Sequence, residues 1–388
     1  MKRKEFVPLA LPSIGEEEKL AVLETLESGW VTAGPNVRRF EALIARYTGA
    51  PHAVALGGCT HALHLALAVL GIGPGDEVVT TPFTFAATAN AIVAAGATPV
   101  FADIEEATCN IDPCRIEERI TERTRAILPV HYAGHPARLD EIHEIARRFG
   151  LFVVEDAAHA FGSAYRGRKI GAISDMTCFS FYATKNITTI EGGAVTTQRE
   201  ELAGRIRILA TQGVSRDAWK RRGKNVWDYD VVEPGFKYTM NDVSAAIGIV
   251  QLGRIEGLLR RRRALAARYD AAFAEHPAIT TPQRAPYLAQ EEYARHLYPI
   301  RIDFSRTSWQ RDRFVEALGE RGIGAGVHYR PLHLHPCPAF SRRYRRGDFP
   351  VAERVFSSIV SLPFFPEMSE ADVDHVAAVV LECLSRPA

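Results

Sequence analysis

The sequence lacks the features that mark membrane, zinc-binding and disulfide-rich proteins. Its 388 residues include six scattered cysteines and no Cys-x-x-Cys pair, so the spacing of a zinc site is missing. We expect reduced thiols and no metal. No apolar run approaches the roughly 20 residues that span a bilayer. The basic start leads to Pro8 and Pro12 rather than to a signal-peptide core, which predicts a cytoplasmic protein.

A strong net charge is also missing. The 47 Lys and Arg residues nearly balance the 46 Asp and Glu residues, so the net charge of +1 favours neither nucleic acid nor a membrane surface. Arg260–Arg263 is a dense basic stretch, and Leu258, Leu259 and Leu265 can form the buried face of a helix there. We therefore expect these arginines on the solvated face of that helix.

The length of the chain predicts two domains. Apolar strands alternate with helices up to about Met240, after which the pattern changes. This alternation predicts an α/β fold, with a mostly parallel mixed sheet covered on both faces in a large domain, 1–250. A smaller α+β C-terminal domain, 251–388, follows.

The expected elements share apolar residues at strand or helix spacing. Strands are expected at His52–Leu56, Glu77–Thr81, Pro99–Asp103, Ala126–Tyr132, Leu151–Glu155, Thr177–Phe181, Gly193–Thr197, His296–Ile302 and Gly326–Tyr329. Helices are expected at Glu16–Ser28, Thr60–Leu70, Phe85–Ala95, Asp112–Ile120, Leu139–Phe149, Asp242–Glu256, Gly257–Glu275, Thr307–Arg321 and Ser369–Leu384. Ser13 with Glu16, and Ser369 with Asp372, have the spacing of capping boxes.

Lys185 is the most informative residue because of its surroundings. It follows the strand that contains Ser180, while Asp156 ends an earlier apolar strand. Pyridoxal phosphate needs these groups: a carboxylate that holds the pyridine nitrogen protonated, a lysine that binds the cofactor covalently and a hydroxyl near the phosphate. Alone, Asp156 could cap a helix and Lys185 could be an exposed turn residue. For Lys185 to act, burial and neighbouring positive charge would have to lower its pKa.

Three further segments could contact such a cofactor. The turn Gly57–Thr60 joins a strand to a helix, so the amides of Cys59 and Thr60 and the Thr60 hydroxyl could bind a phosphate. An ordinary tight turn with Thr60 as N-cap is equally compatible with this pattern. Phe85 could stack on a planar ring. His159, three residues after Asp156, could bond the cofactor's phenolic oxygen or lie beside the ring.

An ordered set of motifs resembles the sugar-nucleotide aminotransferases of the DegT/DnrJ/EryC1/StrS family. The matching segments run nearly end to end: 30–35 (WVTAGP), 59–65 (CTHALHL), 129–136 (PVHYAGHP), 155–159 (EDAAH), 179–186 (FSFYATKN), 234–238 (PGFKY) and 327–333 (VHYRPLH). The resemblance implies a fold type I, pyridoxal-phosphate-dependent aminotransferase that works as a homodimer with composite active sites.

The resemblance also implies roles for single residues. Lys185 would bind the cofactor, Asp156 would pair with its ring nitrogen, and Cys59, Thr60 and Ser180 would hold its phosphate. Phe85 would cover the ring and His159 would lie near its phenolic oxygen. In segment 235–241, which reaches the partner's phosphate site in the family, this chain has Lys237 and Thr239 beside the tyrosine where the family often has asparagine. The phosphate turn reads Gly-Cys-Thr instead of the common Ser-Gly-Thr.

The implied reaction moves the amino group of L-glutamate onto a keto sugar nucleotide, through the pyridoxamine form of the cofactor. A 4-keto-(6-deoxy)hexose or 4-keto-pentose is expected, and Arg330 would suit its diphosphate. The candidate substrate-binding residues are Thr32, Gly34, Asn186, His328, Tyr329 and Arg330.

Several alternatives use related scaffolds. They include amination of a C3-keto sugar or a keto-cyclitol, and sugar dehydration, although dehydrating relatives replace the lysine with histidine. A non-catalytic regulator is disfavoured by the complete set of Asp156, Ser180 and Lys185. A dehydrogenase is disfavoured because no Gly-x-Gly-x-x-Gly opens the first strand–helix unit.

Overall fold

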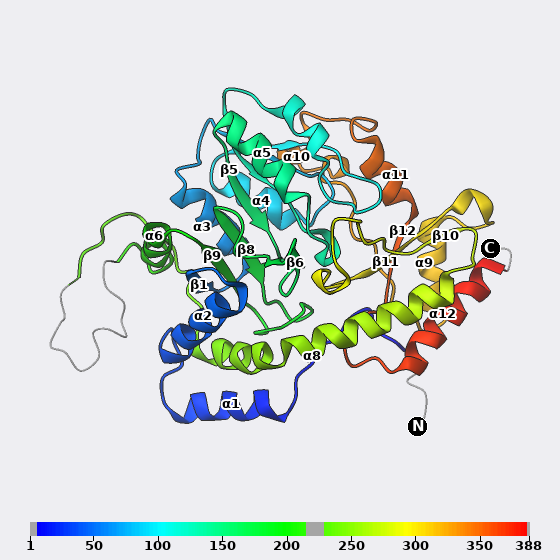
Figure 1. The fold of residues 1–388 in the computed structure, drawn as a ribbon, viewed down its shortest axis with the longest axis horizontal. Coiled ribbons are helices and arrows are strands. Elements are labelled where there is room, and N and C mark those ends of the chain that lie inside the picture. Colours follow the sequence, from blue (N-terminus) through cyan, green and yellow to red (C-terminus); the bar gives the residue numbers. More distant parts are fainter. Residues whose placement is uncertain (1–5, 215–228, 386–388) are drawn as a thin grey trace.

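A seven-stranded sheet forms the centre of the computed structural model, which describes residues 6–214 and 229–385 (Figure 1). Its strands lie in the order β1 (His52–Leu56), β9 (Gly193–Thr197), β8 (Met176–Ser180), β5 (Phe152–Asp156), β4 (Thr124–Leu128), β2 (Glu77–Thr80) and β3 (Thr98–Phe101). In this sheet β9 runs antiparallel to both neighbours, and the other pairs are parallel. The mostly parallel mixed sheet is confirmed.

Helices cover both faces of this sheet because successive strand residues point to opposite sides. Val54 and Val154 pack with α3 (Cys59–Val69) and α6 (Glu200–Ala210) on one face, next to α4 (Ala86–Ala94). Ala53 and Ala55 pack with α2 (Pro35–Thr48) and α8 (Asp242–Phe273) on the other, and Val153 packs with α5 (Leu139–Phe149). Helix α1 (Glu16–Glu27) lies against α8 at the bottom of Figure 1.

The C-terminal part has its own antiparallel sheet. It comprises β10 (Ile279–Thr280), β11 (Tyr298–Ile302) and β12 (Ile359–Leu362), with α9 (Arg311–Glu320), α10 (Pro338–Ser341), α11 (Pro350–Ser358) and α12 (Glu370–Ser385). Val7 belongs to the same apolar core and exchanges backbone hydrogen bonds of 2.8 Å with Gly322 and Gly324. The predicted boundary near residue 250 falls inside the continuous helix α8. The division into domains 1–250 and 251–388 stays a prediction.

Some expected elements are wrong. Segment 112–120 forms two 3₁₀ turns, Pro113–Arg115 and Glu117–Arg119, because only Pro113 and Ile116 of its apolar side chains are buried and Asp112 caps the first turn. Segment 326–329 is not a strand, since only Gly326 bridges to Ser361. The two helices expected at 242–275 are one helix, because their apolar residues continue one buried stripe past the exposed Gly257.

The two capping predictions have opposite outcomes. Helix α1 has Gly15 as its N-cap, and Glu18 accepts the Gly15 N–H at 2.7 Å, whereas the Ser13 hydroxyl donates to Glu367. The box at Ser13 is therefore wrong. The box at Ser369 is confirmed, since the amides of Ser369 and Asp372 donate reciprocally to the two side chains.

The basic stretch of α8 is not wholly solvated. Arg262 is 2% exposed, and its guanidinium donates to the carbonyl oxygens of His296 at 3.1 Å and Phe364 at 3.4 Å. Burial lowers its pKa to about 10. The expectation of a solvated face holds for Arg260 and fails for Arg262, because the C-terminal segment packs over this side of the helix.

Candidate active site

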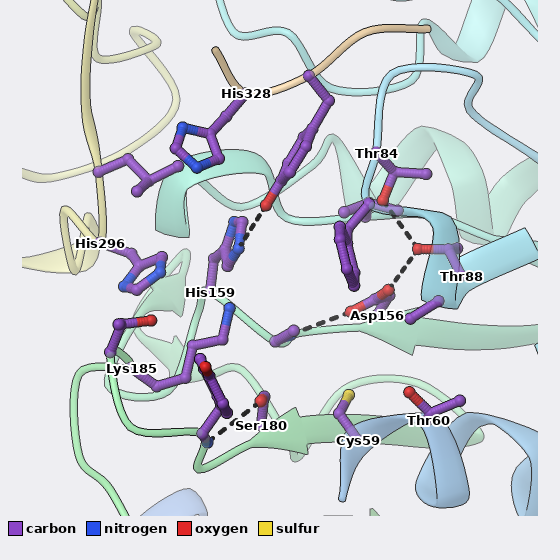
Figure 2. A pocket seen from close by; sticks show the side chains of 18 of the residues that line it. Cys59, Thr60, Thr84, Thr88, Asp156, His159, Ser180, Lys185, His296 and His328 are labelled. Carbon is purple, nitrogen blue, oxygen red and sulfur yellow. Dashed lines mark hydrogen bonds between the residues drawn. The ribbon is translucent and has the colours of Figure 1, made fainter. Parts of the chain in front are cut away.

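A cavity of about 570 Å³ opens at the carboxyl ends of β5 and β8. The N-termini of α3 and α4 form one side, and the C-terminal segments that contain His296, His328 and Phe364 form the other (Figure 2). The sequence-predicted residues that line it are Cys59, Thr60, Phe85, Asp156, His159, Ser180, Lys185, His328 and Tyr329.

Lys185 lies in the turn after β8, and its side chain extends towards His159 (Figure 2). Its amine has no hydrogen bond or ion pair with the described residues. Burial lowers its pKa to about 8, while Cys59 and Asp156 act in the opposite direction. The expected contribution from neighbouring positive charge is wrong, and desolvation alone makes the amine easier to deprotonate.

Asp156 ends β5 with its carboxylate inside the cavity. Oδ2 accepts a hydrogen bond of 2.7 Å from the Thr88 hydroxyl, and Oδ1 accepts the Ala158 N–H at 3.1 Å. Burial raises its pKa, whereas these two bonds and the Lys185 charge oppose that shift. Asp156 does not cap a helix, since the residues that follow it form turns.

The turn Gly58–Thr60 at the start of α3 has the backbone arrangement of a cradle that can bind an anion. Helix α3 begins at Cys59 with Gly58 as N-cap, so Thr60 is not the N-cap and the first amides have no partner within the helix. Ser180 approaches from β8 on the same side of the cavity (Figure 2). A Cβ atom on Gly193 would lie 2.6 Å from the Cys59 nitrogen, so β9 needs glycine beside this cradle.

Imidazole and phenol groups form the opposite wall. His159 Nε2 lies 3.2 Å from the Tyr329 hydroxyl, and the His159 and His296 ring centroids are 4.4 Å apart. His328 Nδ1 lies 2.8 Å from the Ser361 hydroxyl. Burial lowers the pKa of His159 and His296 well below the usual value and that of His328 to about 4. These imidazoles are therefore neutral at neutral pH.

Phe85 is more exposed than the other aromatic residues of the cavity. Its side chain lines the cavity although the residue is 63% exposed, and its ring centroid lies 6.1 Å from that of Tyr329. An apolar ring in this position can cover a planar ligand.

Six predicted residues do not line the cavity within one chain: Thr32, Gly34, Asn186, Lys237, Thr239 and Arg330. Asn186 is buried and bonds His296 Nδ1 at 3.2 Å, so it supports the wall from behind. The Gly34 amide donates to Asp242 at 2.8 Å, and Arg330 donates to the Leu334 carbonyl. Lys237 and Thr239 form bridges to Thr211 and Leu56. Their predicted roles stay predictions.

Sequence reasoning missed several residues of the cavity, among them Thr84, Thr88 and His296. Thr88 lies in the first turn of α4, whereas Thr84 lies in the loop before Phe85, the N-cap of that helix. Helix spacing therefore could not have linked the two residues. His296 lies more than a hundred residues from Lys185 in the sequence, and no local pattern marks it.

These groups together fit pyridoxal phosphate. The cradle at α3 suits a phosphate, Phe85 suits a planar ring, and Asp156 and Lys185 supply the carboxylate and the amine. His159 Nδ1 is buried and has no hydrogen-bond partner among the described residues, so this nitrogen can bond a ligand in the cavity. Over the described ranges 6–214 and 229–385, no cluster of His, Cys, Asp or Glu could hold a metal ion. In the same ranges, no helix is long and apolar enough to cross a membrane. The fold and the cavity therefore place this protein among the enzymes that use pyridoxal phosphate.

Comparisons with known proteins identify the family. Residues 12–381 match the DegT/DnrJ/EryC1/StrS aminotransferase family, and the chain belongs to it. It is 47% identical over 382 residues to the spore coat polysaccharide biosynthesis protein SpsC of Bacillus subtilis, covering 98% of this chain and 97% of that protein.

Solved structures agree with this assignment. The PMP form of the putative sugar aminotransferase Spr1654 of Streptococcus pneumoniae matches with a TM-score of 0.89 and 34% identity, over 98% of this chain and 99% of that one. Helicobacter pylori PseC, an aminotransferase involved in the biosynthesis of pseudoaminic acid, matches with a TM-score of 0.90 and 31% identity, over the same shares.

Proposed function

We propose that this protein transfers the amino group of L-glutamate to a keto carbon of a nucleotide-linked sugar. The cofactor is pyridoxal 5′-phosphate, and the protein is an aminotransferase of the DegT/DnrJ/EryC1/StrS family. The observation that carries the proposal is the meeting of the Lys185 amine and the Asp156 carboxylate in one cavity beside an anion cradle.

The chain's residues would divide the work as follows. When bound, the cofactor supplies an electron sink that makes the C–H bond next to the substrate nitrogen acidic. The α3 amides, Thr60 and Ser180 would hold its phosphate, Asp156 would pair with its ring nitrogen, and Phe85 would cover the ring. The Lys185 amine would bind the cofactor and would then accept a proton from the substrate carbon as base and return it as acid. A pKa of about 8 suits both roles near neutral pH.

The acceptor is proposed to be a 4-keto sugar, a 6-deoxyhexose or a pentose. The names of SpsC, a spore coat polysaccharide biosynthesis protein, and of Spr1654, a putative sugar aminotransferase, support a sugar substrate. His328 and Tyr329 line the cavity and could contact the sugar. Thr32, Gly34, Asn186 and Arg330 stay candidates for its binding.

We also propose a homodimer with composite sites. Among the residues that the structure describes, Lys185 is the one cationic side chain that lines the cavity, whereas the cofactor, the donor and a nucleotide diphosphate are all anionic. Cations from the partner subunit would supply the missing charge, and the segment with Lys237 and Thr239 is the candidate. Lys237 is exposed in the single chain.

The absorption spectrum of purified enzyme tests the proposal. Wild type should show the visible band of lysine-bound cofactor, and glutamate should replace it with the pyridoxamine spectrum. Lys185→Ala should lack the band, while the control Lys169→Ala, at a surface lysine paired with Glu256, should keep it. Wild type without bound cofactor would refute the proposal. If the band of lysine-bound cofactor does not change when glutamate is added, the result would point to another donor or to the dehydratase alternative.

A further inference from the structure

Two buried threonines connect the start of α4 to the carboxylate of Asp156. Thr84 is 3% exposed and Thr88 is 1% exposed, and both line the cavity. The two hydroxyl oxygens lie 2.8 Å apart, and the Thr88 oxygen lies 2.7 Å from Asp156 Oδ2 (Figure 2). Buried hydroxyls normally satisfy their hydrogen-bonding groups, so this chain of contacts has a defined direction.

The direction depends on the charge of Asp156. An ionised carboxylate only accepts hydrogen bonds, so Thr88 must donate to Oδ2. The Thr88 oxygen is then the acceptor, and Thr84 must be the donor between the two hydroxyls. A protonated Asp156 that carried its proton on Oδ2 would reverse both bonds. Donation from Thr84 to Thr88 and from Thr88 to Asp156 is therefore the arrangement in which Asp156 is ionised.

The same contacts also orient the carboxylate. Oδ2 is bonded to Thr88 on α4 and Oδ1 to the Ala158 amide after β5, so two separate elements fix its rotation. Each oxygen keeps one further lone pair for the cavity. Hydrogen bonds to an ionised acceptor are stronger than neutral ones, and they oppose the cost of burying this charge.

We propose that Thr88, supported by Thr84, is a positioning residue that keeps Asp156 charged and aimed at the ring nitrogen of the cofactor. The inference rests on the proposed function, because it concerns the carboxylate that faces pyridoxal phosphate. Thr88 acts only through Asp156. Loss of the Thr88 hydroxyl should lower the pKa of the ring nitrogen in a protein that still folds.

Nitrogen NMR of the holoenzyme with isotopically labelled pyridoxal phosphate tests this inference without measuring activity. In Thr88→Val, the ring nitrogen should lose its proton about one pH unit lower than in wild type, and the cofactor should bind about tenfold more weakly. Thr84→Val should shift the titration in the same direction by less. Thr88→Ser, which keeps the hydroxyl, should titrate like wild type.

Thr48→Val is the matched control. Thr48 is also buried, bonds the Ile44 carbonyl in its own helix and does not line the cavity, so its loss should not move the ring-nitrogen titration. If Thr88→Val and Thr84→Val both bind cofactor and their ring nitrogens titrate as in wild type, the positioning role of Thr88 is refuted while the proposed function stands. If Thr88→Val fails to fold, Thr84→Val and Thr88→Ser decide alone. If wild type binds no cofactor, the proposed function itself fails.

Discussion

The Lys185 amine is governed by two opposing influences at the scale of single residues. Desolvation favours its neutral form, and the neighbouring Asp156 favours the charged form. The first prevails and leaves a pKa of about 8. Near neutral pH the amine is therefore mostly protonated but close to release, which suits a group that must donate and accept a proton in turn.

This balance predicts how apoenzyme takes up its cofactor. Only the neutral amine attacks the aldehyde, so the uptake rate should rise with pH through about 8 and level off above it. Asp156→Asn removes a negative charge that raises the lysine pKa, so its midpoint should lie lower. Stopped-flow absorbance of cofactor binding across pH measures both. A midpoint near the ordinary lysine value in wild type would contradict the desolvation argument.

A second residue-scale prediction concerns Arg262. Its side chain is buried without a carboxylate hydrogen bond, and its guanidinium stabilises the carbonyls of His296 and Phe364 behind the cavity wall. Arg262→Ala would leave a void and two unsatisfied carbonyls, so it should lower the free energy of unfolding by about 3 kcal/mol. The neighbouring Arg260→Ala, at an exposed position, should change it by roughly 0.5 kcal/mol or less. Chemical unfolding compares them, and equal effects would contradict the packing role.

At the scale of elements, the cradle depends on how closely β9 approaches α3. A Cβ atom on Gly193 would lie 2.5 Å from the Gly58 carbonyl carbon and 2.7 Å from the Phe179 oxygen. These contacts are with backbone atoms, which cannot rotate away as a flexible side chain could. The strand must therefore carry glycine where it passes the phosphate turn.

Gly193→Ala should thus separate β9 from α3 and weaken cofactor binding by about tenfold or more, with a loss of stability of about 2 kcal/mol. Gly204→Ala is the matched control. Gly204 lies on the exposed side of α6 with nothing within 4 Å of its would-be Cβ, so alanine should stabilise the protein by roughly 1 kcal/mol. Fluorescence titration with pyridoxal phosphate and thermal unfolding distinguish the two. Unchanged cofactor affinity in Gly193→Ala would show that the cradle tolerates a wider gap.

At the scale of the whole molecule, the cavity joins distant parts of the chain. Leu9 from the N-terminal segment and Phe364 from the C-terminal part line the same space as Lys185. The long helix α8 runs beside both parts and packs against α1, α2 and α12 (Figure 1). The proposed dimer would add a third contribution, from the partner subunit.

Subunit complementation tests the composite site. Lys185→Ala homodimers and Lys237→Ala/Thr239→Ala homodimers should each have strongly reduced activity. If the two lesions belong to different subunits of one site, subunit exchange should restore roughly a quarter of wild-type activity, since half of the dimers are mixed and each has one intact site. Turnover after exchange, with dimerisation checked by light scattering, measures this. Mixed dimers without restored activity would place both lesions in the same subunit's site.

Much of the fold and of the site could be predicted from local pattern. The apolar strands revealed the parallel sheet because strand residues buried on both faces must be apolar. The Asp156, Ser180 and Lys185 set was recognisable because each residue ends or follows a strand, where such sheets place ligands. The capping box at Ser369 was equally local.

Other features depended on contacts that local pattern does not encode. Spacing shows that a helix has a buried face, but the partner that covers it decides whether Arg262 lies inside or outside. Long-range contacts also decide the antiparallel direction of β9 and the position of His296 beside His159. They decide the hydrogen bond from Thr88 to Asp156 as well. So is the pKa of Lys185, because desolvation depends on every atom packed around the amine. Residue types and local periodicity can be read from the chain, whereas the packing of distant segments decides which side chains share one cavity and in which direction burial shifts their pKa values.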